Sequence, residues 1–176
     1  VEPGLLPGEG NNYLCSVVMQ EEQAGVAYVD STTGEFAVTE LGEDDLFGSL
    51  RTELARLRPA EVVYPEGFPL KEALHGHQTP WPAWRFEPGR CSEALLRHFS
   101  ASTLDGFGLR GLPAAVRAAG AIVQYLQETQ PAALSLLVRL SAYSLSEFMN
   151  LDASTRRNLE LTETLRGGTV KGSLLG

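Results

Sequence analysis

Four carboxylates are the side chains of this chain that could most directly take part in catalysis, by holding metal ions. They are Asp30, Glu35, Glu61 and Asp105. Nucleases of the two-metal class hold a pair of divalent cations with carboxylates carried on and beside a sheet. Asp30, however, precedes the polar residues 31–33, a setting in which an aspartate that stabilises a turn is expected. No other acid stands where metal binding is required, so a metal-dependent nuclease is kept as the alternative function and no catalytic or metal-binding residue is assigned.

A second pattern is a possible nucleotide site. Gly106, Gly108 and Gly111 match the spacing G-x-G-x-x-G. In a dinucleotide-binding fold a strand comes directly before this pattern, so that the turn aims the following helix at the pyrophosphate. Residues 93–99, which come before it here, are typical of a helix. We therefore interpret residues 106–111 as a hinge between domains; protection from heat by NAD or ATP would favour the nucleotide-binding alternative.

Histidines and a cysteine raise the question of a zinc site. His75 and His77 would place two imidazoles on one side of an extended segment. Cys91 or His98 could then complete the coordination. The spacing to a third and fourth ligand fits no familiar zinc pattern, and Gly76 between the histidines favours a mobile loop. Solvated loop histidines are the preferred interpretation, and no cofactor is assigned.

Two further groups are candidates for binding. Trp81 and Trp84, which lie among prolines, could form an exposed partner-binding surface or fold back over the sheet. We prefer the second interpretation, because large aromatic side chains more often serve burial. Arg156, Arg157 and Glu160 fall within one predicted helix, where Arg156 and Glu160 have i,i+4 spacing. We interpret this block as a structural junction without chemistry.

Periodicity predicts an α/β domain in the first half of the chain. Runs rich in Val and Tyr over residues 13–19 and 25–30, and alternating apolar residues over 35–41, predict a three-stranded antiparallel meander. Leucines at helical spacing over residues 46–57 predict a helix that ends before Pro59. Residues 61–65 then predict a strand that joins the sheet by a crossover. This β-β-β-α-β order is that of an RNase H-like domain.

The second half of the chain has a different spacing of apolar residues. Pro113 is suited to the first turn of a helix, and the apolar residues that follow predict a long helix that ends near Pro131. Residues 138–143 predict a short strand, and Asp152 is placed to cap a helix over 153–161. We place a domain boundary between residues 103 and 104, so that a mixed α/β domain over 1–103 precedes a mainly α-helical segment over 104–176.

Composition limits the partners. The 176 residues are 43% hydrophobic, which suits a globular chain, and 22 acidic against 14 basic residues give a net charge of −8. This sign is opposite to that of a surface that follows phosphates, so direct DNA binding is disfavoured. Two cysteines are too few for a disulfide framework, which favours the cytoplasm. No apolar run reaches the roughly 18 residues of a membrane helix. We also expect no signal peptide and a chain that is cut at both ends.

Blocks of residues along the whole chain resemble the bacterial DNA mismatch-repair family MutS. In the first half, residues 11–14 and 27–36 are similar to strands of the family's connector domain. In the second half the matching blocks are residues 106–109 (GFGL), 118–121 (AAGA), 125–126 (YL), 129–130 (TQ), 149–152 (MNLD), 155–161 (TRRNLEL) and 172–175 (GSLL). The ordered set, more than any single block, carries the resemblance.

The resemblance implies an RNase H-like connector over residues 1–103 and the start of the helical core, or lever, domain over 104–176. In this family other domains read the mismatch through a Phe-x-Glu motif and hydrolyse ATP with Mg²⁺ through a Walker motif. Neither motif occurs in this sequence. The resemblance therefore implies a piece that is not an enzyme and holds no cofactor.

The family's connector also implies a set of partners. It links the mismatch-reading and ATPase ends of the protein and offers a surface to MutL. The expected partners are therefore MutL and the remaining MutS domains, with mismatched DNA reached only through a whole protein that is a homodimer or higher oligomer. No motif indicates which residues contact MutL.

Overall fold

The computed structural model describes residues 13–42, 45–74 and 76–144. Its strands are β2 Tyr13–Gln20, β3 Gln23–Asp30, β4 Glu35–Leu41, β5 Glu61–Pro65, β6 His77–Trp81 and β7 Ser141–Ala142. Its helices are α1 Leu46–Leu57, α2 Pro88–Phe99, α3 Pro113–Thr129 and α4 Pro131–Leu134, with short 3-10 turns η2 Lys71–Ala73, η3 Ala83–Phe86 and η4 Asp105–Phe107. The chain divides into two compact units, residues 1–142 and 143–176. All of these elements lie in the first unit.

The strands form one mixed sheet in the order β6-β5-β2-β3-β4-β7. Strands β2, β3 and β4 make the predicted antiparallel meander. After helix α1 crosses over, β5 pairs in parallel with β2, and β6 then pairs in parallel with β5. The prediction of an α/β fold with a mixed sheet and a β-β-β-α-β order is confirmed.

Strand β6 is the one strand of the described sheet that the sequence patterns do not predict. Its residues are mostly polar and include Pro80, which cannot donate a backbone hydrogen bond to a neighbouring strand. It lies at the edge of the sheet, where proline is tolerated because one side of the strand needs no partner. Its position beside β5 therefore depends on the sheet more than on its own β propensity.

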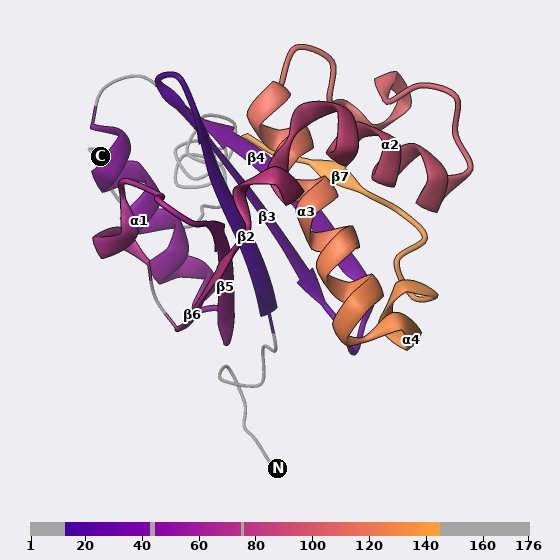
Figure 1. The fold of residues 1–176 in the computed structure, drawn as a ribbon, viewed down its shortest axis with the longest axis horizontal. Helices are drawn as coiled ribbons and strands as arrows, with labels where there is room; N and C mark the ends of the chain where they lie inside the picture. The colour runs from indigo at the N-terminus through magenta and orange to yellow at the C-terminus, as the bar shows by residue number, and fades with distance from the viewer. Residues whose placement is uncertain (1–12, 43–44, 75, 145–176) are drawn as a thin grey trace, which may run out of the picture. The chain divides into compact units, whose positions relative to one another are not determined.

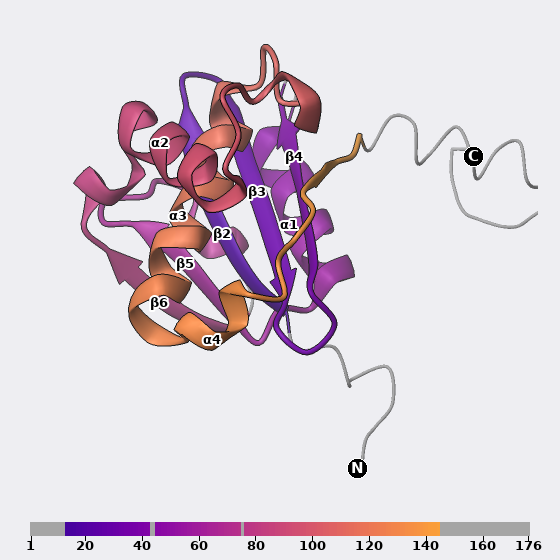
Figure 2. The ribbon, with the colours of Figure 1, turned by 90° about the vertical axis from the view of Figure 1, so that its right-hand side faces the viewer.

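Helices cover both faces of the sheet, with α1 on one face and α2 and α3 on the other (Figures 1 and 2). The larger core lies under α3, where side chains of β2, β3 and β4 pack against a helix face made largely of alanine. Small side chains let a helix approach a sheet closely, since fewer atoms separate the two backbones. The residues of α3 in this core are Ala115, Ala118, Ala119, Ala121, Ile122, Val123 and Leu126.

Two glycines mark the closest approaches of α3. A Cβ added to Gly25 of β3 would lie 2.0 Å from the carbonyl oxygen of Ala114, at the start of α3. A Cβ added to Gly120 would lie 2.3 Å from the Cβ of Cys91 in α2. Neither distance is possible between non-bonded atoms, so α3 can lie where it does only because both positions lack a side chain.

Polar groups from distant parts of the chain hold the first turns of α3. This helix has no side-chain cap of its own at Leu112. Instead the Glu40 carboxylate, from β4, accepts hydrogen bonds from the backbone N–H groups of Ala114 (2.6 Å) and Ala115 (3.3 Å). A carboxylate at this end also interacts favourably with the helix dipole. Glu40 thus caps a helix that lies 74 residues further along the chain.

Arg117 of α3 ties the same region to two other elements. Its guanidinium donates to the carbonyl oxygens of Phe86 (2.7 Å) and Met19 (3.3 Å) and to the side-chain oxygen of Gln20 (3.2 Å). These contacts join α3 to the end of β2 and to η3. Helix α3 is therefore an integral part of the unit that contains the sheet.

This arrangement differs from the boundary that we placed between residues 103 and 104. The first unit continues to Ala142. Leu140 is still in the core, and strand β7, which contains Ala142, pairs with β4. Gly106, Gly108 and Gly111, whose spacing we interpret from the sequence as a hinge between domains, lie inside this unit. They belong to the connection between α2 and α3, two helices that pack on each other. A glycine-rich stretch indicates a turn but does not say whether the chain returns to the same core.

Other expectations for the second half are met in part or lie outside the described residues. The strand predicted over residues 138–143 is present as the shorter β7. The predicted helix over 153–161 lies outside the described residues, as do all of residues 145–176 of the proposed helical core segment. Among the helices that the structure describes, none is long and apolar enough to cross a membrane.

We predict that Gly120→Ala destabilises the fold by about 1–3 kcal/mol, the usual cost of forcing extra atoms into a packed core. The new methyl group would meet the backbone of Cys91, which cannot move without separating α2 from α3. Gly89→Ala is the matched control, because nothing lies within 4 Å of a Cβ added in that first turn of α2. Urea unfolding followed by circular dichroism measures both, and equal stabilities of the two variants would contradict the close helix contact.

We also predict that Glu40→Ala lowers the free energy of unfolding by about 1 kcal/mol, as the loss of a helix cap usually does. Glu40→Gln should cost less, because the amide oxygen still accepts a hydrogen bond while the charge is lost. Glu22→Ala, in the exposed turn between β2 and β3, serves as the control. The account of the cap fails if Glu40→Ala and Glu22→Ala unfold at the same urea concentration.

Candidate functional site

Rings and guanidinium groups alternate in a stack near the start of α2. The Cζ atom of Arg85 lies 4.6 Å from the ring centroid of Trp81 and 4.5 Å from that of Trp84. The Cζ atom of Arg90 lies 4.5 Å from the Trp84 ring centroid. All three are cation–π distances. Trp84 is therefore held between two arginines before any partner arrives.

The two tryptophans have different surroundings. Trp81 packs against the core, with its ring edge-on to Tyr125 at 5.2 Å between centroids. Trp84 leaves 46% of its surface exposed. Each of the two interpretations therefore holds for one of the tryptophans. Trp81 folds back over the sheet, whereas Trp84 is exposed to solvent. The sequence pattern does not distinguish them, because both lie in the same proline-containing segment, residues 80–84.

Beside this stack, α2 and α3 enclose a hollow of about 450 Å³. Two of its arginines form ion pairs: Arg85 with Glu128, and Arg97 with Glu93 at 2.6 Å in an exposed i,i+4 pair on α2. Arg90 is exposed and has no ion pair among the residues that the structure describes. We call this surface the α2–α3 face, formed by Trp84, Arg85, Arg90, Glu93, Arg97 and Glu128.

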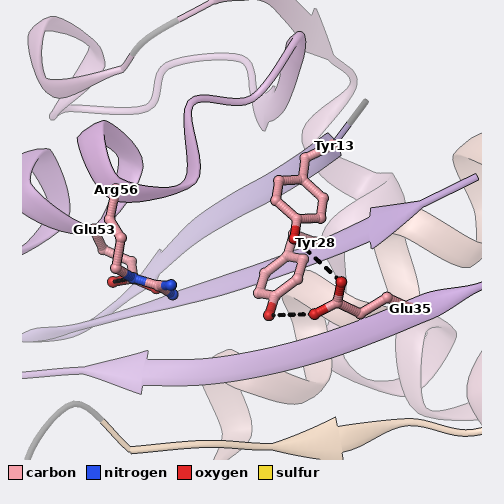
Figure 3. A network of polar contacts seen from close by, with 5 residues as sticks. All are labelled: Tyr13, Tyr28, Glu35, Glu53 and Arg56. Carbon is pink, nitrogen blue, oxygen red and sulfur yellow. Dashed lines mark hydrogen bonds and ion pairs between the residues drawn. The ribbon is translucent and has the colours of Figure 1, made fainter. Parts of the chain in front are cut away.

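The carboxylates considered for metal catalysis have structural hydrogen bonds. Asp30 accepts from the backbone N–H (2.9 Å) and hydroxyl (2.6 Å) of Thr32, as expected for a turn aspartate. Glu35 of β4 accepts from the hydroxyls of Tyr13 (3.1 Å) in β2 and Tyr28 (3.0 Å) in β3 (Figure 3). Burial, followed by the charge of Glu35, raises the pKa of both phenols. This cluster therefore links β2, β3 and β4.

Glu61 and Asp105 lie in other settings. Glu61 accepts from the hydroxyls of Tyr125 (2.5 Å) and Thr79 (2.7 Å), which connects β5 to α3 and β6. Asp105 begins the exposed turn η4. Across residues 13–42, 45–74 and 76–144, no group of three or more His, Cys, Asp or Glu side chains is placed to hold a metal ion. The structure does not bring the four candidate carboxylates together.

The zinc candidates are also separate. The Cys91 thiol is buried and lies 3.3–3.4 Å from the carbonyl oxygens of Arg117 and Arg85, and burial raises its pKa to about 12. A ring nitrogen of His98 lies 2.7 Å from the carbonyl oxygen of Leu137. His77 is exposed at the start of β6, and His75 lies outside the described residues. Cys91 and His98 thus join α2 to its neighbours.

The remaining sequence candidates add no site. The segment of Gly106, Gly108 and Gly111 follows helix α2, so the strand that a dinucleotide turn requires is not in front of it. Arg156, Arg157 and Glu160 lie outside the described residues. No chemistry is assigned to either group.

One acid of α1 is buried together with the leucines of the helix's apolar face. Glu53 is 1% exposed, and its carboxylate accepts from the guanidinium of Arg56, with 3.0 Å to Nε (Figure 3). The i,i+3 spacing of the two residues was the available signal. The spacing of the leucines alone does not indicate that Glu53 is buried. A charged residue beside an apolar stripe can be buried when its partner is on the same helix.

Tyr125 gives the unit a testable dependence on alkaline pH. Burial, and then the hydrogen bond to Glu61, raises its pKa to about 12 from an ordinary value of 10.0. A pKa that is higher in the folded chain adds stability below pH 10, and this stability is lost as the pH rises towards 12. We predict that Tyr125→Phe makes the fall in unfolding free energy between these pH values shallower. Urea unfolding across this range measures it, and an unchanged slope would count against the buried phenol.

Comparison with known proteins relates the chain to one family. The family model described as MutS domain II matches residues 12–138. The DNA mismatch repair protein MutS of Dehalococcoides mccartyi (strain ATCC BAA-2266 / KCTC 15142 / 195) is 42% identical over 178 residues, which cover 100% of this chain and 20% of that protein. The MutS proteins of Trichodesmium erythraeum and Roseiflexus castenholzii are 39% and 35% identical, over 99% and 100% of this chain and 21% and 20% of theirs. The chain thus spans about a fifth of the length of these relatives.

Proposed function

The chain belongs to the MutS family and contains MutS domain II, the connector, and we propose that it works as a non-catalytic connector in a DNA mismatch-repair protein. Its role would be to couple movements of the mismatch-reading and ATPase domains and to offer a docking surface to MutL. In this proposal ATP, Mg²⁺ and mismatched DNA bind elsewhere in the whole protein, which would be a cytoplasmic homodimer or higher oligomer.

The anchoring of α3 supports the coupling role. A domain transmits movement when it moves as one body about flexible ends. Glu40, Arg117 and the close contacts at Gly25 and Gly120 join α3 to the sheet and to α2. The pivot would then lie at the ends of the unit, near residue 142, and not at residues 106–111 inside it.

The single observation that carries the docking role is the exposed, pre-ordered Trp84. Tryptophan and arginine are enriched among the residues that dominate binding energy at protein interfaces. Trp84 is 46% exposed and stacked between Arg85 and Arg90, beside the hollow between α2 and α3. A side chain that is already held in place loses little conformational entropy when a partner covers it. We therefore assign MutL docking to the α2–α3 face.

The test is a binding titration of the chain with purified MutL, with mismatched duplex DNA run in parallel. Saturable MutL binding without DNA binding is the expected result. Trp84→Ala should weaken the MutL affinity by about tenfold or more, as loss of a central aromatic anchor does. Leu136→Ala is the control, because Leu136 is also 46% exposed but lies against Gly34, in the turn between β3 and β4.

Two results would contradict the docking role. In the first, the folded wild-type chain fails to bind MutL at any concentration tested. In the second, Trp84→Ala and Leu136→Ala bind MutL equally well, which would place the docking surface away from the α2–α3 face.

A further inference from the structure

We infer that the α2–α3 face receives an acidic segment of its partner, with the Arg90 guanidinium binding a carboxylate of that segment next to Trp84. The inference rests on the proposed docking function. It adds the chemistry of the partner segment and names the residue that selects it.

Of the three arginines on the α2–α3 face, Arg90 is the one that forms no ion pair with a described residue. Arg85 and Arg97 are already paired with Glu128 and Glu93. Arg90 is exposed and stacks on Trp84, and no carboxylate of the described residues forms an ion pair with it. Its guanidinium has five N–H donors in a planar fork that matches the two oxygens of a carboxylate. A carboxylate is therefore the ligand that complements this group.

The position of Arg90 on its helix points the same way. Arg90 lies in the first turn of α2, and that turn contains no acidic residue. The N-terminal end of a helix carries a partial positive charge, so acids are favoured there and arginine is not. Glu87, just before the helix, is exposed and forms no ion pair with Arg90. Glu87 at the N-cap is the acid nearest this helix end, and because the first turn itself contains none, an incoming carboxylate beside Arg90 would still be favoured there.

The stack also prepares the site. Because Trp84 lies between Arg85 and Arg90, its ring and both guanidinium groups hold one another in place. The Nε of Arg85 is buried without a hydrogen-bond partner among the described residues. A bound segment could place its apolar portion on the exposed part of Trp84 while its carboxylate reaches Arg90. One contact of each kind gives the site both affinity and a preference for acidic sequence.

A nucleic-acid phosphate is also an anion, but the face suits it less well. Proteins that follow a phosphate backbone use several unpaired lysines or arginines. Here two of the three arginines are neutralised, Glu93 and Glu128 stand beside them, and the whole chain carries a net charge of −8. One available arginine beside an aromatic ring fits a short acidic peptide segment.

The experiment compares MutL binding by the wild-type chain, Arg90→Glu and Arg51→Glu at low and high salt. Arg51→Glu makes the same charge change at an exposed position of α1, on the opposite face of the sheet. We expect Arg90→Glu to weaken binding by about tenfold or more and to reduce its salt dependence, since loss of a charged contact costs roughly one factor of ten or more. Arg51→Glu should bind as the wild type does. Arg90→Lys should be intermediate, because it keeps the charge but loses the planar fork.

The outcomes separate this inference from the docking role on which it rests. If the wild type binds MutL and Arg90→Glu binds as tightly as Arg51→Glu, the acidic-segment inference is overturned while docking stands. If the folded wild type does not bind MutL, both fail. If the wild type binds duplex DNA and Arg90→Glu abolishes that binding, the ligand is a phosphate and the inference is overturned. Circular dichroism and melting temperatures confirm that each variant is folded.

Discussion

The close packing of α3 between the sheet and α2 is the constraint on which the rest of the unit depends. Gly25 and Gly120 permit it, because a side chain at either position would collide with backbone or Cβ atoms of the neighbouring element. Glu40 then satisfies the backbone N–H groups that the start of α3 exposes. With α3 fixed, α2 has one place to pack, and the start of α2 carries the stack around Trp84. The surface proposed for docking is thus positioned by the helix packing beneath it.

Most acidic side chains discussed here are engaged inside the fold. Glu40 caps a helix, Glu35 joins three strands through two tyrosines, and Glu61 links β5 to α3. A carboxylate that already accepts two hydrogen bonds from protein donors has less capacity for a metal or a substrate. Part of the acidic composition therefore serves internal stabilisation. Arg90, exposed and without an ion pair among the described residues, is the residue to which the proposed docking assigns the partner's carboxylate, because it stacks on Trp84.

Local patterns in the sequence predict the meander, α1, β5 and most of α3, because each shows a clear period and a stop signal. Strand β6 is hidden by its polar residues and by Pro80, which only an edge position tolerates. The boundary expected between residues 103 and 104 falls inside the first compact unit. A glycine-rich turn looks alike whether the chain enters a new domain or returns to the same core. The cap by Glu40 joins residues 74 positions apart, so no local pattern reports it. Likewise, the prolines in this segment do not indicate that Trp81 is partly buried and that Trp84 is exposed.

The central proposal is that this connector presents the α2–α3 face to MutL while its sheet stays intact. Hydrogen–deuterium exchange of the chain, alone and with MutL, tests it without any substitution. Slower exchange on binding is predicted around η3 and α2 and in the last turns of α3, with α1 unchanged because it covers the other face of the sheet. Protection confined to α1 and the strands beneath it, with none in α2, would contradict the claim.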